Sequence, residues 1–279
     1  MRSFLLFAAI IFSMNSFCQK NNGQIVLNKG QKFTVKNTMS QEADMGMGME
    51  MKNFTTSQTS YIVLDVADKN YSISSTLTGM KVSMDFMGQQ TTYDSDLKSD
   101  SASEIGKSMR DLNTPDTVSV DKYTGTVIAD AKTVTEPKEA DSNPMENLFE
   151  SLGDNNKNVS ISEAFFIIPA GKKTGDSWID SSSTKDIKTL KTYTIKSIAK
   201  NIATVNIIGT VVSNIQTEVQ GLQVNVSMTT KTDSEVITDT KTSLVTRRTT
   251  KADINGNLEL MGQAAPVTGK ATITSVYEY

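Results

Sequence analysis

The sequence predicts a mainly β protein: a curved antiparallel sheet, half-barrel or sandwich, with two short covering α-helices. Runs rich in Val, Ile, Thr and Tyr alternate apolar and polar residues, as in Tyr61–Val66 and Leu222–Met228. That period of two is typical of strands buried on one face. Between two such strand-rich halves, two short stretches repeat their apolar residues at helical spacing, which predicts the two helices.

The N-terminus has the features of a secretory signal peptide over residues 1–18. Arg2 supplies a positive start, Phe4–Phe12 is apolar, and Ser16 and Cys18 offer small residues before a cleavage site. We therefore expect an exported protein, in the periplasm, at the cell surface or secreted. Cleavage after Cys18 is favoured over lipidation of this Cys, because Phe17 stands where a lipid-attachment site has a small residue. Lipidation remains the open alternative.

No later segment is apolar for long enough to cross a bilayer, so no transmembrane segment is expected. The chain contains no His, which excludes Ser-His-Asp and Cys-His catalysis as well as His-ligated zinc. Its formal net charge is −3 and no basic stripe is present, so nucleic-acid binding is not expected. These exclusions favour a non-enzymatic protein without a cofactor. They do not indicate an oligomeric state.

The composition divides the chain into four parts. Residues 1–18 form the signal peptide, 19–93 a first β unit, 94–168 an acidic region containing the helices, and 169–279 a second β unit. In the acidic region, Ser101–Glu104 is a capping box for the first helix, and Asn143-Pro144 is a typical start for the second. The expected apolar stripes of the two helices are Ile105, Met109 and Leu112, and Met145, Leu148, Phe149 and Leu152.

The stretch Pro169–Trp178 opens the second β unit. Its ending, Gly175-x-x-Trp178, matches Gly30-x-x-Phe33, and Tyr61–Val66 matches Tyr193–Ile198 in the same register. These matches suggest two pseudo-repeated β units, an alternative that short Thr- and Val-rich strands leave open. We expect Trp178 to anchor the core of the second unit, and Asn255-Gly256 to form a turn between two of its strands.

Four methionines alternate in Met45-Gly-Met-Gly-Met-Glu-Met51. In a strand their thioethers would share one face, with Met84 and Phe86 on a neighbouring strand. Such a face could line a cavity for a flexible apolar ligand, or its soft sulfur atoms could bind Cu(I). Because neither His nor a second Met motif supports a copper site, the lining role is favoured.

Three carboxylates lie close together in Tyr93-Asp-Ser-Asp96 and Asp100. Carboxylates in a loop could bind Ca²⁺, but the Gly that an EF-hand needs at its sharp turn is missing. A solvated loop is therefore favoured over a calcium site.

Three stretches together resemble an uncharacterised family of secreted bacterial envelope proteins, a domain of unknown function: residues 45–51, Tyr93–Asp96 and Pro169–Trp178. The motifs are structural, so the resemblance implies no activity. More loosely, a curved sheet with covering helices is similar to periplasmic lipid and lipoprotein carriers.

The favoured function is an exported, non-enzymatic envelope protein that binds an apolar or amphipathic, lipid-like ligand between sheet and helices. The alternatives are a Met-rich Cu(I)-binding protein and a structural or adhesive surface protein. The expected lining residues are Met45, Met47, Met49, Met51, Met84, Phe86, Ile105, Met109, Leu148, Phe149 and Leu152.

Overall fold

The computed structural model describes residues 23–44, 46, 48–103, 106, 112–128, 161–219, 222–260 and 263–279. Its strands are β1 (Lys32–Asp44), β2 (Glu50–Val66), β3 (Asn70–Phe86), β4 (Gln89–Asp94), β5 (Asp116–Asp121), β6 (Val127–Ile128), β7 (Ser177–Ser183), β8 (Ile187–Ala199), β9 (Ile202–Val219), β10 (Leu222–Asp239), β11 (Val245–Leu260) and β12 (Gln263–Glu278).

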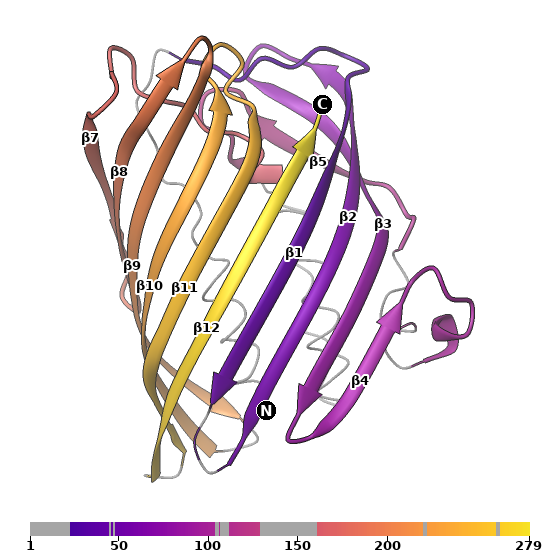
Figure 1. Cartoon of the computed structure of the whole chain (residues 1–279), viewed down its shortest axis with the longest axis vertical. Helices are drawn as coiled ribbons and strands as arrows, with labels where there is room; N and C mark the ends of the chain where they lie inside the picture. Colours follow the sequence, from indigo (N-terminus) through magenta and orange to yellow (C-terminus); the bar gives the residue numbers. More distant parts are fainter. Residues whose placement is uncertain are drawn as a thin grey trace.

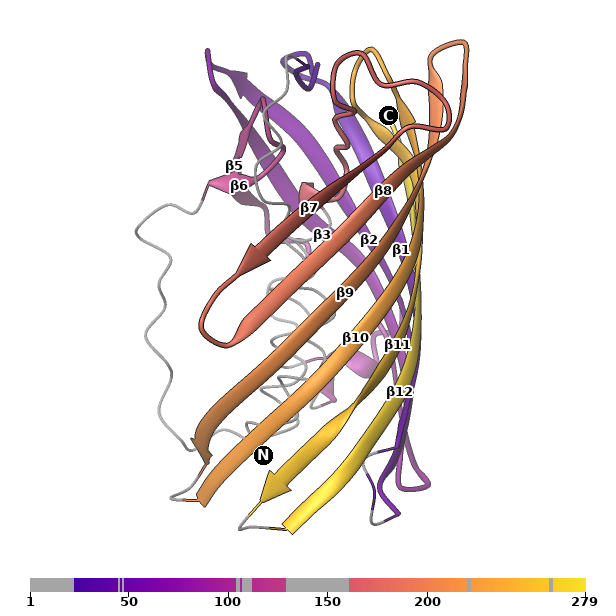
Figure 2. The ribbon, with the colours of Figure 1, turned by 90° about the vertical axis from the view of Figure 1, so that its left-hand side faces the viewer.

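The strands form one 12-stranded sheet in the order β6-β5-β3-β2-β1-β12-β11-β10-β9-β8-β7, with β4 also paired to β3. All its ladders are antiparallel. The path is open, and the sheet bends into a deep trough (Figures 1 and 2). The prediction of a mainly β, curved antiparallel sheet is therefore confirmed.

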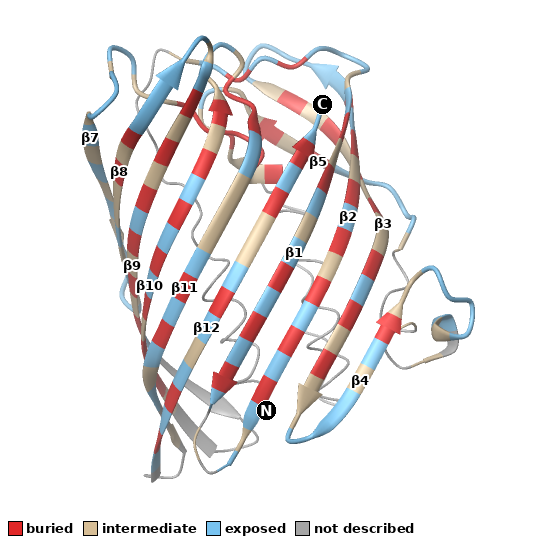
Figure 3. Cartoon of the chain, viewed as in Figure 1, coloured by how far each residue is buried: buried red, intermediate tan, exposed pale blue. Residues whose placement is uncertain are grey.

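The central strands are unusually long. β2 and β3 have 17 residues each, and β9 and β10 have 18. At ~3.3 Å per residue each spans roughly 55–60 Å, whereas ordinary strands have about five or six residues. Buried and exposed residues alternate along them (Figure 3). The sheet thus has an inner face, which carries Phe33 and Tyr61, and an exposed outer face.

Within the described ranges, the helical element with defined bounds is a 3₁₀ turn, η1 (Asp100–Ala102). Neither predicted α-helix is confirmed. Ile105 and Met109 of the first, and all of the second, fall outside these ranges, whereas Leu112 lies in a turn. No helix among the described residues is both long and apolar enough to span a bilayer.

Two local predictions were wrong. The predicted strand of four methionines is not found in its described part, because β1 ends at Asp44, β2 begins at Glu50, and Gly46, Gly48 and Met49 lie in neither strand. Gly46 and Gly48 have φ of 71° and 74°, which is turn geometry that L-residues with side chains rarely adopt. The predicted turn at Asn255-Gly256 lies inside β11, where Gly256 lets β10 approach closely: a Cβ there would overlap the Ser227 carbonyl oxygen.

The main core lies at the end of the sheet that holds the C-terminus. We call it the upper cluster; it joins inward residues of both halves to Ile25 and Leu27 from the segment before β1 and to Ile161 and Phe165 from the segment before β7. Backbone hydrogen bonds fix both segments, Ile25 N–H to Lys122 O at 2.8 Å and Phe166 N–H to Ser243 O at 2.9 Å. These segments close one end of the trough.

The Gly-x-x-aromatic matches occupy equivalent positions in the two β units. Gly30 (φ 80°) donates its N–H to Val63 O at 2.8 Å, and Gly175 (φ 90°) donates to Ile195 O at 2.9 Å. A register shift follows each acceptor on the adjoining ladder.

The aromatic residues that follow these glycines also repeat. Phe33 stacks on Tyr61 with ring centroids 4.9 Å apart, and Trp178 stacks on Tyr193 at 5.0 Å. Each stack joins directly opposed residues on neighbouring strands. Trp178 is partly buried and packs against the upper cluster, so it contributes to the core without being enclosed by it.

A third repeat was not foreseen. Asp121 Oδ1 accepts hydrogen bonds from the backbone N–H and the hydroxyl of Thr124, at 2.8 and 3.1 Å. Asp239 Oδ1 does the same for Thr242, at 2.9 and 3.2 Å. The Asp-x-x-Thr turn therefore leads out of β5 and out of β10 with the same geometry.

Candidate functional site

A second apolar cluster lies on the inner face, farther along the trough from the upper cluster. We call it the lower cluster; its buried members are Ala43, Met51, Val211, Val226, Met228, Ala252, Ile254, Val267 and Ala271. Strand register assembles it, since Ala43 is opposite Met51 and Ala252 is opposite Ala271. Small alanines beside flexible methionines give a surface that adapts to the shape of whatever packs against it.

Buried polar side chains accompany the lower cluster on the same face. They come from β1, β2, β9, β10 and β12 and form what we call the polar band: Gln41, Asn53, Thr55, Ser57, Ser213, Thr230, Thr232, Ser234 and Ser275. A face that only served as a core would carry apolar residues here, because burying a polar group costs free energy unless it is hydrogen-bonded.

Part of this polar band lacks hydrogen-bond partners. Among the described residues, Gln41 Nε2, Ser213 Oγ and Thr230 Oγ1 are buried and make no hydrogen bond. Gln41 is 3% exposed, and Ser213 and Thr230 are fully buried. Because each such group costs about 1–3 kcal/mol, unsatisfied groups in one region indicate a place where water or a ligand completes the bonding.

A charged group adjoins the polar band. Arg248 on β11 is opposite Ser275, and its side chain is 16% exposed. Its contacts to Glu163 are long, 3.7 Å from Nη1 to Oε1 and 3.5 Å from Nη2 to the carbonyl oxygen. Three strands along the sheet from β11, Lys191 on β8 lies opposite Asp180 on β7. Two cations and two carboxylates therefore face the interior.

Burial and neighbouring charges shift the pKa values of Lys191, Tyr193 and Tyr277. Burial, with the nearby Arg248 charge, lowers the pKa of Lys191 from 10.5 to about 8, although Glu163 and Asp180 act in the opposite direction. Burial, followed by the Asp180 charge, raises the pKa of Tyr193 to about 12. Burial, with Glu163 as the next cause, also raises the pKa of Tyr277 well above its ordinary value. The site is thus a region of poor solvation in which a cation is disfavoured.

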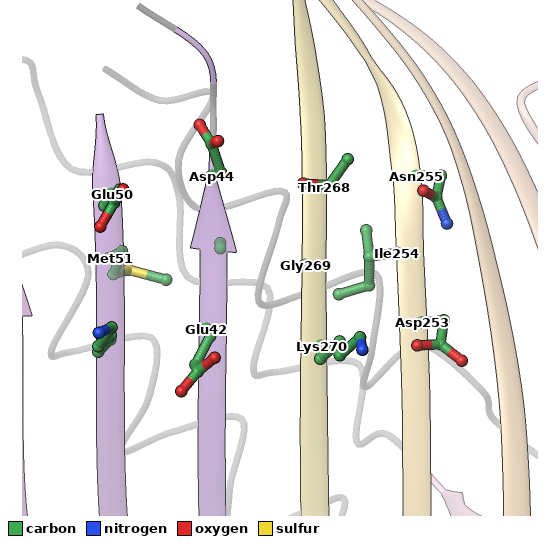
Figure 4. A pocket seen from close by; sticks show the side chains of 12 residues that line it. Glu42, Asp44, Glu50, Met51, Asp253, Ile254, Asn255, Thr268, Gly269 and Lys270 are labelled. Atoms are coloured by element: carbon green, nitrogen blue, oxygen red, sulfur yellow. The ribbon is translucent and has the colours of Figure 1, made fainter. Parts of the chain in front are cut away.

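A depression of about 300 Å³ lies beside the end of β1, the start of β2 and interior residues of β11 and β12 (Figure 4). Its exposed lining residues are Glu42, Asp44, Glu50, Lys52, Asp253, Asn255, Thr268 and Lys270. Ala43, Met51 and Ile254 of the lower cluster also line it, so this depression joins exposed charged side chains to the apolar surface of that cluster. Across the described part of the chain, no three His, Cys, Asp or Glu side chains are arranged to hold a metal ion.

The structure places some predicted lining residues together. Met51 and Phe86 are directly opposed on β2 and β3, Met84 is buried on the same face, and Met49 and Phe86 pack against the lower cluster. The remaining predicted residues lie outside the described ranges: Met45, Met47, Ile105, Met109, Leu148, Phe149 and Leu152. Gly46, Gly48 and Met49 lie outside the strands, so the described part of this stretch does not support the strand face on which the copper alternative depended.

Sequence reasoning missed the polar part of the site. One signal was available in Arg247-Arg248, since neighbouring residues of a strand point to opposite faces and one of the two had to face inward. A second was Leu190-Lys191, which reverses the usual pattern: Leu190 is 50% exposed, while Lys191 faces inward.

The acidic loop 94–100 is held by its own contacts. Lys81 Nζ lies 2.9 Å from Asp94 and 3.1 Å from Asp96, and Asp100 accepts the Asp94 N–H at 2.9 Å. The Asp96 N–H and the Lys81 ammonium lower the pKa of Asp94. An ammonium group thus sits beside these carboxylates, as expected of a solvated loop.

Fold and site together define an open antiparallel β-sheet protein with an inner face that is apolar in one part and polar in another. The chain belongs to a family of unknown function (DUF6263), whose model matches residues 68–245. This confirms the resemblance to such a family. Two of the stretches that carried it, Tyr93–Asp96 and Pro169–Trp178, lie inside the matched region, and residues 45–51 lie outside it. No curated protein sequence gives a significant match.

Among solved structures, the chain is similar to lipovitellin in a structure titled for its lipid–protein interactions. The identity is 8% and the TM-score 0.50; the match covers 91% of this chain but only 26% of the lipovitellin chain. OccK7 (OpdD) of Pseudomonas aeruginosa matches at 5% identity and a TM-score of 0.27, covering 90% of this chain and 99% of its own. An outer membrane channel (COG4313) from Pseudomonas putida F1 matches at 6% and 0.26, covering 93% and 99%. The lipovitellin likeness concerns the fold alone, and the other two are too distant to bear on this chain.

Proposed function

We propose that this chain is an exported, non-enzymatic protein that binds an apolar or amphipathic ligand on the inner face of its sheet. The observation that carries the proposal is the pairing of the lower cluster with unsatisfied buried groups such as Gln41 Nε2 and Thr230 Oγ1. A ligand with an apolar body and a polar end supplies partners to both kinds of surface.

The different side chains of the upper and lower clusters support this proposal. The upper cluster has large aromatic side chains and is closed by backbone segments, as a stabilising core requires. The lower cluster has alanines and methionines on long strands, a surface that can adapt to a guest molecule. The likeness of the fold to lipovitellin, whose structure is titled for lipid–protein interactions, agrees with a lipid-like guest. The predicted signal peptide supports an activity outside the cytoplasm.

The test is to purify the mature chain from its own host and determine its mass under native conditions, followed by lipid extraction. We expect bound apolar or amphipathic molecules that survive purification. A uniform ligand-free mass, together with failure to bind the uncharged probe Nile red, would refute the proposal.

A matched pair of variants locates the site. Ala252→Trp adds a large ring on the inner face within the lower cluster, whereas Lys251→Trp adds the same ring one residue away on the exposed outer face. Ala252→Trp should lower the amount of bound Nile red severalfold, and Lys251→Trp should leave it unchanged. Circular dichroism identifies any variant that does not fold, in which case the smaller Ala252→Leu replaces it. Equal loss in both variants would place the binding elsewhere.

A further inference from the structure

Arg248 and Tyr277 present hydrogen-bond donors that the protein leaves unused. Arg248 Nε and Tyr277 OH are both buried and, within the described residues, have no hydrogen-bond partner. Tyr277 is 4% exposed, and it lies two residues along β12 from Ser275, the residue opposite Arg248. Both side chains are on the inner face, so a single bound group can accept hydrogen bonds from both.

The carboxylate nearest to Arg248 does not use these donors. A guanidinium group has five N–H donors in a planar fork, and a well-formed ion pair brings N and O to about 2.7–2.9 Å. The two contacts with Glu163 are 3.5 and 3.7 Å long, and the Glu163 side chain is 32% exposed. Arg248 is therefore a mostly buried cation with two long contacts to Glu163, and among the described residues its Nε–H is left for a second, better-placed oxyanion.

Strand β11 carries both Arg248 and residues of the lower cluster. Ala252 and Ile254 of the lower cluster lie four and six residues beyond Arg248 on β11, on the same face. At ~3.3 Å per residue the distance along the strand is roughly 13–20 Å, a length that a long acyl chain covers. Thr232 and Thr230 line this path from β10, opposite Ala252 and Ile254.

We infer that the ligand is an anionic amphiphile, whose carboxylate or phosphate oxygens bind Arg248 and Tyr277 while its apolar chain lies along β11 against the lower cluster. This inference rests on the proposed function and adds the chemical class of the ligand. Planar N–H pairs suit the paired oxygens of carboxylates and phosphates, and the poorly solvated surroundings strengthen such a contact. Lys191 is a second cation on the same face.

The experiment measures binding of oleate, oleoyl lysophosphatidate and uncharged oleyl alcohol to the mature chain, by displacement of Nile red. Arg248→Met should weaken binding of at least one anion by about tenfold or more, because hydrogen bonds to charged groups contribute about 1.5–3 kcal/mol. It should leave oleyl alcohol unchanged, which also shows that the variant is folded. Tyr277→Phe should weaken the same anion severalfold, and Arg248→Lys should restore part of its binding.

Arg247→Met is the matched control, because Arg247 adjoins Arg248 but is exposed on the outer face. It should change none of the three affinities. If Arg248→Met weakens the binding of oleate alone, the natural head group is a carboxylate. If it weakens the binding of lysophosphatidate alone, the head group is a phosphate. If it weakens both, the site accepts either oxyanion. Unchanged anion binding in Arg248→Met, with all three probes still bound, would overturn the inference and leave the proposed function intact. Absence of binding of every probe to the wild type would instead remove the proposed function.

Discussion

Replacing Lys191 by Met should change how the stability of the ligand-free protein depends on pH. Burial and the Arg248 charge lower the pKa of Lys191 to about 8, against 10.5 in an unfolded chain, and this shift already includes the opposing effects of Glu163 and Asp180. Between these two values the unfolded chain holds a proton that the native protein has released. The free energy of unfolding therefore rises with pH across this range.

The size of the effect follows from the shift. One pKa unit corresponds to about 1.4 kcal/mol, so raising the pH from 7 to 9.5 should increase the free energy of unfolding by at most about 2 kcal/mol. Measurements should stay below pH 10. Burial and Asp180 raise the pKa of Tyr193 to about 12, and stability is lost above pH 10 because the unfolded chain releases the phenolic proton first.

Urea unfolding followed by circular dichroism at pH 7 and pH 9.5 measures the difference. The wild type should gain stability between these values, whereas Lys191→Met should gain little and should be the more stable protein at pH 7. Lys188→Met is the control, since Lys188 lies on the same strand with an exposed side chain. An equal gain in wild type and Lys191→Met would show that the Lys191 ammonium is not disfavoured in the interior.

Three further substitutions test the fold. Gly256→Ala should lower the free energy of unfolding by about 1–3 kcal/mol in a urea titration, because the added Cβ would overlap the Ser227 carbonyl oxygen; a neutral effect would mean that β10 moves aside freely. Trp178→Ala should cost about 2 kcal/mol, less than the 3–5 of an enclosed aromatic side chain, because the ring is partly buried; unchanged melting with lost ligand binding would make it a binding residue instead. Asp239→Ala should cost about 1–2 kcal/mol at pH 7 by removing the side-chain cap of its turn. Although burial acts to raise the pKa of Asp239, backbone N–H groups lower it overall, so this contribution should fade only as the pH falls below about 3.8; an equal cost at pH 2.5 and pH 7 would contradict this origin.

The sequence predicted the strands well wherever alternation kept one phase. The alternating runs Tyr61–Val66 and Leu222–Met228 lie in β2 and β10, as the pattern predicted. The alternation rule failed where the order of inward and outward residues along β3 changes. Leu77 and Met80 are three residues apart and both face inward, because a register shift in the ladder with β2 accommodates one extra residue between them. The residues on both sides of this shift belong to one strand of 17 residues, β3.

The methionine and arginine motifs show the limits of local pattern. Alternating methionines predicted a strand face, but the glycines between them adopt positive φ, and backbone conformation decided the outcome. Arg247-Arg248 required one inward guanidinium, yet nothing local indicated which of the two it was. The registers of β10, β11 and β12 decide that it is Arg248.

The sequence by itself determined that this chain is a β protein, which residues share a face wherever the alternation is unbroken, and that Gly30-x-x-Phe33 and Gly175-x-x-Trp178 are equivalent. These features depend on near neighbours along the chain. Only the tertiary structure decided which faces meet: it brought Arg248 beside Glu163, placed Lys191 where both of their charges act on it, and separated the lower cluster from the upper one. Such contacts depend on strand order and sheet curvature, which arise from pairing over long separations and leave no periodic signal in the chain.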